Sequence, residues 1–303
     1  MRIVSLLPST TEIVFGLGAG DEVVGVTFEC DHPAEARTRR VVSTSAMPEG
    51  LTPAQIDAFV ADALRRGEDL YRLEADALRD LAPDVVLTQD LCAVCAVDVA
   101  VVDDALAHLG CTAEVLTVDP HTLAEVLESV VTIGERIGRS DAAHDWVATL
   151  RERLDVVERA VAGRPRPRVL LLEWTDPPFA PGHWIPEMVE LAGGDCVLGA
   201  AGEKSVRITW EAAITAAPDV VVCAPCGFDT DAAADLAAEV ASRFPGASVW
   251  AVDANAAFAR PGPRLVDGVE ALAALLHPGA LDASAPDPDP ELARLVRAAP
   301  AQV

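Results

Sequence analysis

The sequence predicts an α/β protein with two lobes, each a mainly parallel sheet flanked by helices. First, an apolar strand at residues 2–6 precedes a turn, a helix and another apolar run at residues 23–27, which is how a parallel α/β sheet begins. Second, residues 121–162 carry no strand signal and separate two regions of alternating strands and helices. Third, LRDLAPDVVL at residues 78–87 is paralleled by AITAAPDVVV at residues 213–222, as expected of two similar lobes.

The first lobe is expected over residues 1–118. Its first helix follows a turn at Pro8, and Ser9-Thr10-Thr11-Glu12 has the spacing of a capping box. We therefore expect Ser9 or Thr10 to cap that helix. Short apolar runs predict further strands, and apolar residues at helical spacing predict further helices. The strands are expected at residues 41–44, 85–88 and 114–118, and the helices at residues 54–66, 73–81 and 99–109.

The remainder of the chain is expected to form a linking helix, a second lobe and a tail. Residues 119–164 have apolar positions at helical spacing, and Gly138 either kinks this helix or breaks it in two. The second lobe spans residues 165–277, with strands at residues 168–173, 220–223 and 248–252 and helices at residues 185–192, 210–216, 232–243 and 265–276. Residues 278–303 form a proline-rich tail that is expected to be loosely ordered or to hold a short helix near Leu292.

Composition excludes some classes of partner. The chain has 48 acidic and 23 basic residues and a formal charge of −25, so this acidic protein is not expected to bind nucleic acid or an anionic membrane surface. No segment reaches the ~20 apolar residues needed to span a bilayer, so no membrane insertion is expected. The first residues belong to a strand and not to a secretory signal, which predicts a cytoplasmic location with reduced cysteines; a trimmed N-terminus would instead allow a periplasmic or extracellular location.

The opening segment also carries a family resemblance. The motif S-L-L-P-S-x-T-E-I-x-F-x-L-G-x-G-D-x-V-V-G-V-T, followed by C-D-H-P, resembles the start of the helical-backbone class, class III, of ABC-transporter substrate-binding proteins. That class handles cobalamin, haem and ferric siderophores, and the resemblance is greatest to its cobalamin-binding branch. It extends, more weakly, to about residue 277. The resemblance implies two lobes joined by a long backbone helix, with a small-molecule ligand in the cleft between them.

Loops that follow strands supply the candidate binding residues, because ligands of parallel α/β sheets bind at the carboxyl ends of the strands. In the first lobe the candidates are Pro8, Ser9, Thr10, Glu29, Asp31, His32, Gln89 and Asp90. In the second lobe they are Glu173, Trp174, Phe179, His183, Trp184, Phe228, Phe258 and Arg260. His32 is the candidate nitrogen ligand for the cobalt of a corrinoid, although it is equally interpreted as a solvated loop residue.

Aromatic residues favour a large planar ligand. Three of them fall within residues 173–184, where they either contact one face of a macrocycle or pack a proline-rich loop onto its own lobe. The segment F-x-R-x-x-P-R at residues 258–264 resembles the stretch where cobalamin-binding relatives place an aromatic residue and an arginine at the ligand. The resemblance implies those roles for Phe258 and Arg260, but Ala256 stands where the relatives have an acidic residue.

The cysteines allow three interpretations. Cys92-x-x-Cys95 and Cys223-x-x-Cys226 both follow predicted strands, where cysteines serve as small apolar core residues, as a redox dithiol, or as ligands of a soft metal or cluster. The candidate ligands of a zinc or iron–sulfur site are Cys30, His32, Cys92, Cys95 and Cys226.

Two functions follow from these patterns. The first is a binding protein that holds cobalamin or a related corrinoid or tetrapyrrole between its lobes. The second is a cytoplasmic metalloprotein or enzyme on the same scaffold, with a cysteine-ligated metal and with Glu29, Asp31, His32 or Glu173 as acid–base groups. For a secreted form, the resemblance implies an ABC permease as partner, docked through one carboxylate per lobe. Asp76 and Glu211 stand at the corresponding positions, although acidic residues at helix starts are also ordinary partners of the helix dipole.

Overall fold

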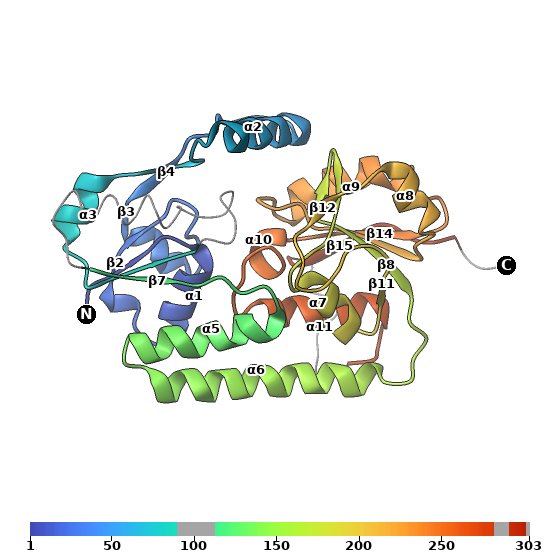
Figure 1. Ribbon diagram of the computed structural model, residues 1–303. Coiled ribbons are helices and arrows are strands. Elements are labelled where there is room, and N and C mark those ends of the chain that lie inside the picture. The colour runs from blue at the N-terminus through green and yellow to red at the C-terminus, as the bar shows by residue number, and fades with distance from the viewer. Residues whose placement is uncertain (90–112, 282–290, 301–303) are drawn as a thin grey trace. The chain divides into compact units, whose positions relative to one another are not determined.

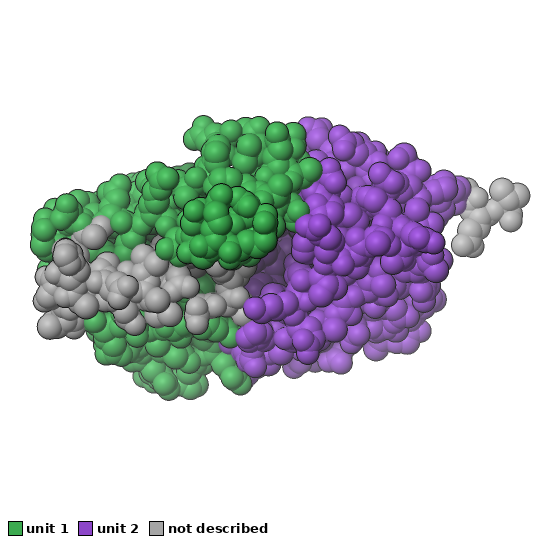
Figure 2. All heavy atoms as spheres, turned by 45° about the horizontal axis from the view of Figure 1, so that its top comes forward, with its two compact units in different colours: residues 1–120, 127–147 green, residues 121–126, 148–303 purple. Residues whose placement is uncertain are grey.

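The computed structural model describes residues 1–89, 113–281 and 291–300 (Figure 1). The chain divides into two compact units, coloured separately in Figure 2. Unit 1 comprises Met1–Pro120 and Leu127–Val147, and unit 2 comprises His121–Val126 and Ala148–Val303. Each unit contains a five-stranded sheet with helices, which confirms the predicted α/β class. Among the helices that the structure describes, none combines the length and apolar character that a membrane span requires.

The sheet of unit 1 is entirely parallel, in the order β3-β2-β1-β6-β7. Its central strand pairs Ile3 with Val23 on one side and with Val85 on the other. The single strand expected at residues 41–44 is split in two: β3 lies at the edge of this sheet, and β4 pairs with β5 in a separate antiparallel sheet. The strands are β1 (Ile3–Ser5), β2 (Val23–Val26), β3 (Arg40–Val41), β4 (Ser43–Ser45), β5 (Tyr71–Leu73), β6 (Val85–Thr88) and β7 (Glu114–Thr117).

The first helix, α1 (Pro8–Gly16), corrects the expected capping box. Leu7 is its N-cap and makes no side-chain cap, because a leucine side chain has no acceptor; Pro8 occupies the first helical position, where a missing N–H costs nothing. The hydroxyls of Thr10 and Thr11 instead donate to the Leu7 carbonyl, at 3.2 and 3.0 Å. The capping box of this unit is at Thr52 and opens α2. The other helices and 3-10 turns are α2 (Pro53–Arg66), α3 (Ala75–Leu81), η1 (Gly20–Glu22) and η2 (Ala34–Thr38).

Two helices lie in the segment expected to link the lobes, α5 (Leu123–Arg136) and α6 (Ser140–Val161). The chain breaks between them at Gly138, whose φ of +71° suits glycine, so of the two alternatives the break is confirmed. The division between the units falls within both helices. In unit 1, α6 packs against α1 so closely that a Cβ atom on Gly16 would lie 2.2 Å from the Trp146 ring.

The sheet of unit 2 has the order β11-β8-β13-β14-β15, and only its last strand is antiparallel. Alternate residues of β8 point to opposite faces. Leu170 and Leu172 belong to the core cluster formed with α9, whereas Val169 lies against Gly194, beside α7 and α11. The strands of this sheet are β8 (Arg168–Leu172), β11 (Asp195–Cys196), β13 (Val220–Cys223), β14 (Ser248–Val252) and β15 (Ala293–Arg297).

Five helices and a small second sheet complete unit 2. Side chains of Thr209, Asp229 and Asp253 cap three of the helices by accepting backbone N–H groups. The helices are α7 (Ile185–Leu191), α8 (Trp210–Thr215), α9 (Thr230–Ala241), α10 (Ala254–Ala257) and α11 (Leu265–Leu276). The second sheet is antiparallel and consists of β9 (Trp174–Thr175), β10 (Pro178–Ala180) and β12 (Val206–Arg207), with β10 in the middle.

The strand β15 overturns the prediction for the tail. The segment expected to be loosely ordered or helical near Leu292 is an edge strand paired with β14. Its amino end accepts a hydrogen bond from the Thr230 hydroxyl, and Arg297 donates to the carbonyls of Ala241 and Ala247. Pairing with a strand that lies about forty residues earlier gave no local signal in the sequence.

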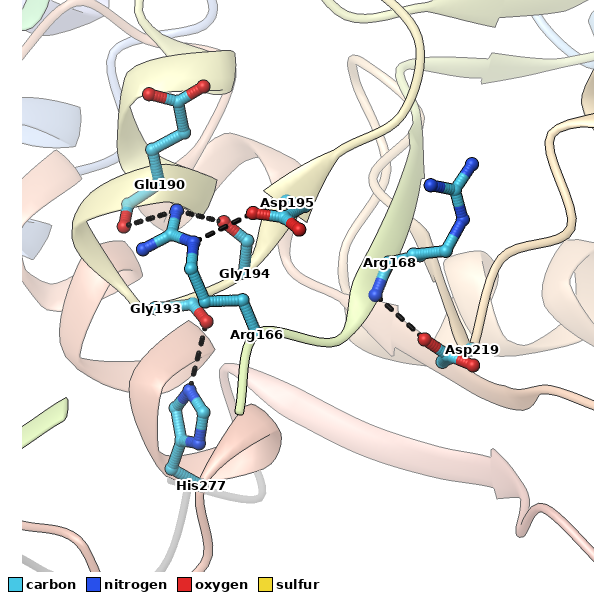
Figure 3. Close-up of polar contacts among 8 residues, drawn as sticks. All are labelled: Arg166, Arg168, Glu190, Gly193, Gly194, Asp195, Asp219 and His277. Atoms are coloured by element: carbon cyan, nitrogen blue, oxygen red, sulfur yellow. Dashed lines mark hydrogen bonds and ion pairs between the residues drawn. The ribbon is translucent and has the colours of Figure 1, made fainter. Parts of the chain in front are cut away.

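Polar contacts fix the amino ends of the strands in unit 2 (Figure 3). Arg166, just before β8, binds the Asp195 carboxylate at 2.7 Å and the carbonyls of Glu190 and Gly194 at the end of α7. The Arg168 amide donates to Asp219, just before β13, at 2.9 Å. These contacts secure the sheet edge opposite to the loops that follow the strands.

An ion-pair cluster joins α6 to α11 within unit 2. Arg153 donates to Glu270 at 2.7 and 2.9 Å and to Asp267 at 2.5 Å. The hydrogen bond to Glu270 raises the pKa of Arg153, against the lowering effect of burial, and Asp267 raises it further. Each side chain is about one-third exposed, so solvent screens the attraction only in part.

We expect the substitution Arg153→Ala to lower the free energy of unfolding by about 1–2 kcal/mol, because it leaves two carboxylates together without their cation. Chemical denaturation followed by circular dichroism measures the change. Arg151→Ala, an exposed arginine two residues earlier on the same helix, is the matched control and should change stability by less than ~0.5 kcal/mol. Equal losses of unfolding free energy in both variants would contradict a stabilising role for the ion-pair cluster.

Candidate ligand-binding site

A cluster of buried hydroxyl groups closes the carboxyl end of β1 in unit 1. The Ser5 hydroxyl lies 2.6 Å from that of Thr10 and accepts from that of Thr11 at 2.8 Å. The Thr11 hydroxyl also lies 3.0 Å from the Cys30 sulfur, which joins the loop after β2 to the start of α1. Ser9, Thr10 and Cys30 are all at most 3% exposed. With the buried Pro8, these predicted site residues support the loop in this structure and do not form its surface.

The loop after β2 presents the polar surface of this unit. Glu29 and Asp31 are half-buried and His32 is exposed. The hydroxyl of Tyr71 donates to the Glu29 carboxylate at 2.8 Å, and its ring lies 5.8 Å from that of Phe28, which is 39% exposed. Sequence reasoning missed Tyr71, although it is the only tyrosine of the chain.

Gln89, at the end of β6, is 3% exposed, and its side-chain oxygen has no hydrogen-bond partner among the described residues. The predicted site residues Asp90, Cys92 and Cys95 lie outside the described residues. Their assignment remains a prediction.

In unit 2, the loops after β8 and β13 lie together and present two aromatic side chains. The rings of Trp174 and Phe228 meet edge to face, with centroids 5.6 Å apart. The Cys226 amide donates to the Glu173 carbonyl at 3.3 Å, which connects the two loops directly before the aromatic residues. Both rings are only half-buried. This aromatic pair is the strongest part of the candidate site, because half-exposed rings offer apolar surface to a ligand.

The loop after β14 joins the same group. The Gly227 amide donates to the Asn255 side chain at 3.1 Å. Asp253 caps α10 by accepting the Ala256 amide at 2.7 Å. Burial raises the pKa of the Asp253 carboxyl group, whereas the hydrogen bond from Ala256 and the charges of Arg264 and Arg260 lower it. The half-buried Arg260 therefore lies within electrostatic reach of Asp253 and belongs to this loop group.

Two predicted aromatic contacts face the interior instead. Phe258 is 1% exposed and Trp184 is 5% exposed. The Trp184 indole donates to the Phe258 carbonyl at 2.8 Å, so the two residues hold the loop after β14 to α7. Phe179 is half-buried beneath the Arg207 guanidinium, 5.7 Å from its ring centroid. For Trp184 and Phe258, the structure favours the packing interpretation over ligand contact.

His183 has an unusual backbone conformation, with φ at +49°. Its amide donates to the Glu203 carbonyl at 2.6 Å, and its own carbonyl accepts from Gly202 at 2.9 Å. The ring lies 5.8 Å from that of His121 and 5.5 Å from that of Trp184. Burial, followed by the nearby His121 and Lys204, lowers the pKa of His183. The imidazole is therefore held in its neutral form, which suits an acceptor or a metal-binding nitrogen.

Glu173 uses both oxygens of its carboxyl group within the protein. One accepts the Gly182 amide at 2.9 Å, and the other accepts the hydroxyl of Ser205. Burial raises the pKa of Glu173, against the lowering effect of these two hydrogen bonds. The sequence placed Glu173 at the ligand or in acid–base chemistry, whereas its contacts here are with its own unit.

The described residues give no support to a zinc or iron–sulfur site. Among them, no group of three or more histidine, cysteine, aspartate and glutamate side chains is placed to hold a metal ion. Cys226 is exposed, and burial raises the pKa of its motif partner Cys223 to about 12, which disfavours a thiolate there. A metal site through Cys92 and Cys95 lies outside what the structure describes.

The two acidic residues considered for permease docking are exposed. Asp76 forms an ion pair with Arg79 on the next turn of α3, at 2.9 Å, and Glu211 lies in the first turn of α8. Both positions also suit the helix dipole, so the structure leaves both interpretations in place.

Comparison with known proteins identifies the class. The family model described as periplasmic binding protein matches residues 3–249, and the chain belongs to this family. A relative from Bacillus subtilis, the uncharacterized ABC transporter substrate-binding lipoprotein YvrC, is 28% identical over 91% of this chain and 80% of its own length. The vitamin B12-binding protein of Yersinia pestis is 24% identical over 73% of this chain and 68% of its own.

Solved structures share the fold. The haem-binding protein RhuT from Roseiflexus superposes with a TM-score of 0.69 at 20% identity, over 92% of this chain and 99% of its own. The vitamin B12-binding protein BtuF of Vibrio cholerae superposes with a TM-score of 0.62 at 21% identity, over 91% of this chain and 96% of its own. These likenesses confirm the class III architecture of two α/β lobes. The family also establishes a ligand-binding role.

The raised pKa of Glu173 predicts a pH-dependent stability. A carboxyl group whose pKa is higher in the folded state contributes stability below its unfolded pKa, near 4.5, and that contribution is lost as pH rises through the folded pKa. We therefore expect the wild type to lose stability relative to Glu173→Gln as pH rises from about 4.5 toward neutrality. Denaturant unfolding at a series of pH values measures this difference. A difference that does not change with pH would show that the buried carboxyl is not the cause.

Proposed function

We propose that this protein binds cobalamin or a related corrinoid. The observation that carries the proposal is the half-exposed Trp174–Phe228 pair at the carboxyl ends of β8 and β13. Flat aromatic surfaces suit the face of a macrocycle, and parallel sheets bind ligands at this edge. The similarity to vitamin B12-binding proteins supports a corrinoid in particular.

Unit 1 offers complementary chemistry. His32 is exposed beside Glu29 and Asp31, and an exposed imidazole is a suitable nitrogen ligand for the cobalt of a corrinoid. The Tyr71–Glu29 hydrogen bond fixes the carboxylate of that loop and leaves His32 at its outer end. In the proposal His32 is the nitrogen ligand of the cobalt.

Haem is the competing ligand within the same proposal. Solved relatives of the same fold include haem-binding proteins, and an aromatic pair also suits a porphyrin. Corrinoids carry neutral amide side chains, whereas haem carries two carboxylates. With a formal charge of −25, the protein favours the less anionic macrocycle. A permease of the ABC-transporter class is the proposed protein partner, as the family implies.

Titration with hydroxocobalamin tests the proposal, with hemin as the parallel ligand. We expect saturable one-to-one binding of hydroxocobalamin, with a shift in its visible absorption that His32→Ala abolishes. Binding of hemin in preference to hydroxocobalamin would overturn the corrinoid assignment, and absence of binding by either would overturn the proposal. Elemental analysis of the purified protein before titration identifies any metal that it already carries.

Truncation of the aromatic pair should weaken ligand binding. We expect Trp174→Ala and Phe228→Ala each to raise the dissociation constant for hydroxocobalamin about tenfold, which corresponds to ~1.4 kcal/mol. Trp210→Ala is the matched control, because that ring packs against Arg243 and Phe244 elsewhere in unit 2. Isothermal titration calorimetry measures all three. A loss of affinity in the control equal to that in the pair would place the site elsewhere.

A further inference from the structure

We infer that Glu173 is a positioning residue that latches the hairpin of residues 174–184 to the facing segment of residues 199–207, and so sets the place of the Trp174–Phe228 pair. The inference rests on the proposed function for what the aromatic pair contacts, and on hydrogen bonds within unit 2 for the latch itself. It replaces the acid–base and ligand-contacting roles that the sequence suggested for Glu173.

The side chain of Glu173 joins the two segments directly. Its carboxyl oxygens accept the Gly182 amide, at 2.9 Å, on the hairpin and the Ser205 hydroxyl on the facing segment. The residue is half-buried. Both carboxyl oxygens accept hydrogen bonds from the protein itself, which is the arrangement expected of a residue that positions its neighbours.

The main chain of Glu173 adds a second contact to the hairpin and joins one further segment. Its amide donates to the Phe179 carbonyl on β10 at 3.2 Å, and its carbonyl accepts from Cys226 in the loop after β13 at 3.3 Å. Trp174 is the next residue along the chain, and Phe228 follows two residues after Cys226. The two aromatic residues are therefore each anchored at one end through Glu173.

Backbone packing shows that the two segments depend on close contact. A Cβ atom on Gly182 would lie 2.4 Å from the Glu203 carbonyl oxygen and 2.4 Å from the Ser205 nitrogen. Only glycine permits such an approach, and the buried carboxyl group of Glu173 accepts the amide that would otherwise lack an acceptor there. The hydrogen bonds between His183 and the segment Gly202–Glu203 continue the same contact.

Hydrogen exchange of the ligand-free protein tests the latch. The informative amides are those of His183 and Gly202, because they cross between the two segments without touching the Glu173 side chain. In Glu173→Ala we expect both amides to exchange about tenfold faster or more, as expected when the contact opens locally. The Ala224 amide, which donates to Leu172 inside the sheet, should be unchanged.

Three further variants separate positioning from general stability. Glu173→Gln keeps an oxygen for the Gly182 amide and an NH₂ group for Ser205, so it should restore slow exchange. Ser205→Ala, a milder change that removes one of the two bonds, should give an intermediate rate. Glu270→Ala lowers stability through the Arg153 cluster and should leave both reporter amides slow.

Titration with hydroxocobalamin then links the latch to binding. We expect Glu173→Ala to weaken binding about tenfold, Glu173→Gln to bind like the wild type and Glu270→Ala to show no loss. Slow exchange of His183 and Gly202 in Glu173→Ala, or equal acceleration in Glu270→Ala, overturns the latch. A wild type that binds neither hydroxocobalamin nor hemin overturns the proposed function alone, since the exchange measurement needs no ligand.

Discussion

Parallel strands bring their carboxyl ends to one edge of a sheet, and the chain must satisfy the polar groups there while leaving side chains available for a ligand. In each unit, side chains from neighbouring loops satisfy the polar groups at this edge of the sheet. In unit 1, the hydroxyls of Ser5, Thr10 and Thr11 close the edge beside Cys30. In unit 2, the buried carboxyl group of Glu173 does so, by accepting from Gly182 and Ser205. The same position in the fold is thus secured by neutral hydroxyls in one unit and by a single acidic residue in the other.

The two edges differ in what they offer to a ligand. The loop after β2 is polar, with Glu29 held by Tyr71 and His32 exposed. The loops after β8 and β13 present the rings of Trp174 and Phe228. The half-exposed rings of unit 2 suit the apolar face of a macrocycle better than a small polar solute.

Aromatic residues illustrate how similar chemistry leads to different roles. Trp174 and Trp184 both lie in the proline-rich stretch of residues 173–184, where no sequence pattern distinguishes the role of one from that of the other. The indole of Trp184 is 5% exposed and donates to the Phe258 carbonyl, whereas Trp174 is half-buried and meets Phe228 edge to face. Phe258, which the family resemblance places at the ligand, is 1% exposed. The residue type determines which ligands a side chain is able to contact, and the packing of neighbouring residues determines whether the side chain is accessible to a ligand.

The sequence by itself determined the α/β class, the two sheets and most helices, because hydrophobic periodicity and turn residues are local signals; β13, β14 and α11 lie where they were predicted. It also pointed to the loops that contain the candidate site. Only the tertiary structure decided the contacts between distant residues. Tyr71 reaches Glu29 across 42 positions, Glu173 reaches Ser205 across 32, and β15 pairs with β14 where a loose tail was expected. Such pairings depend on how strands and loops pack in three dimensions, and the local pattern of residues carries no record of them.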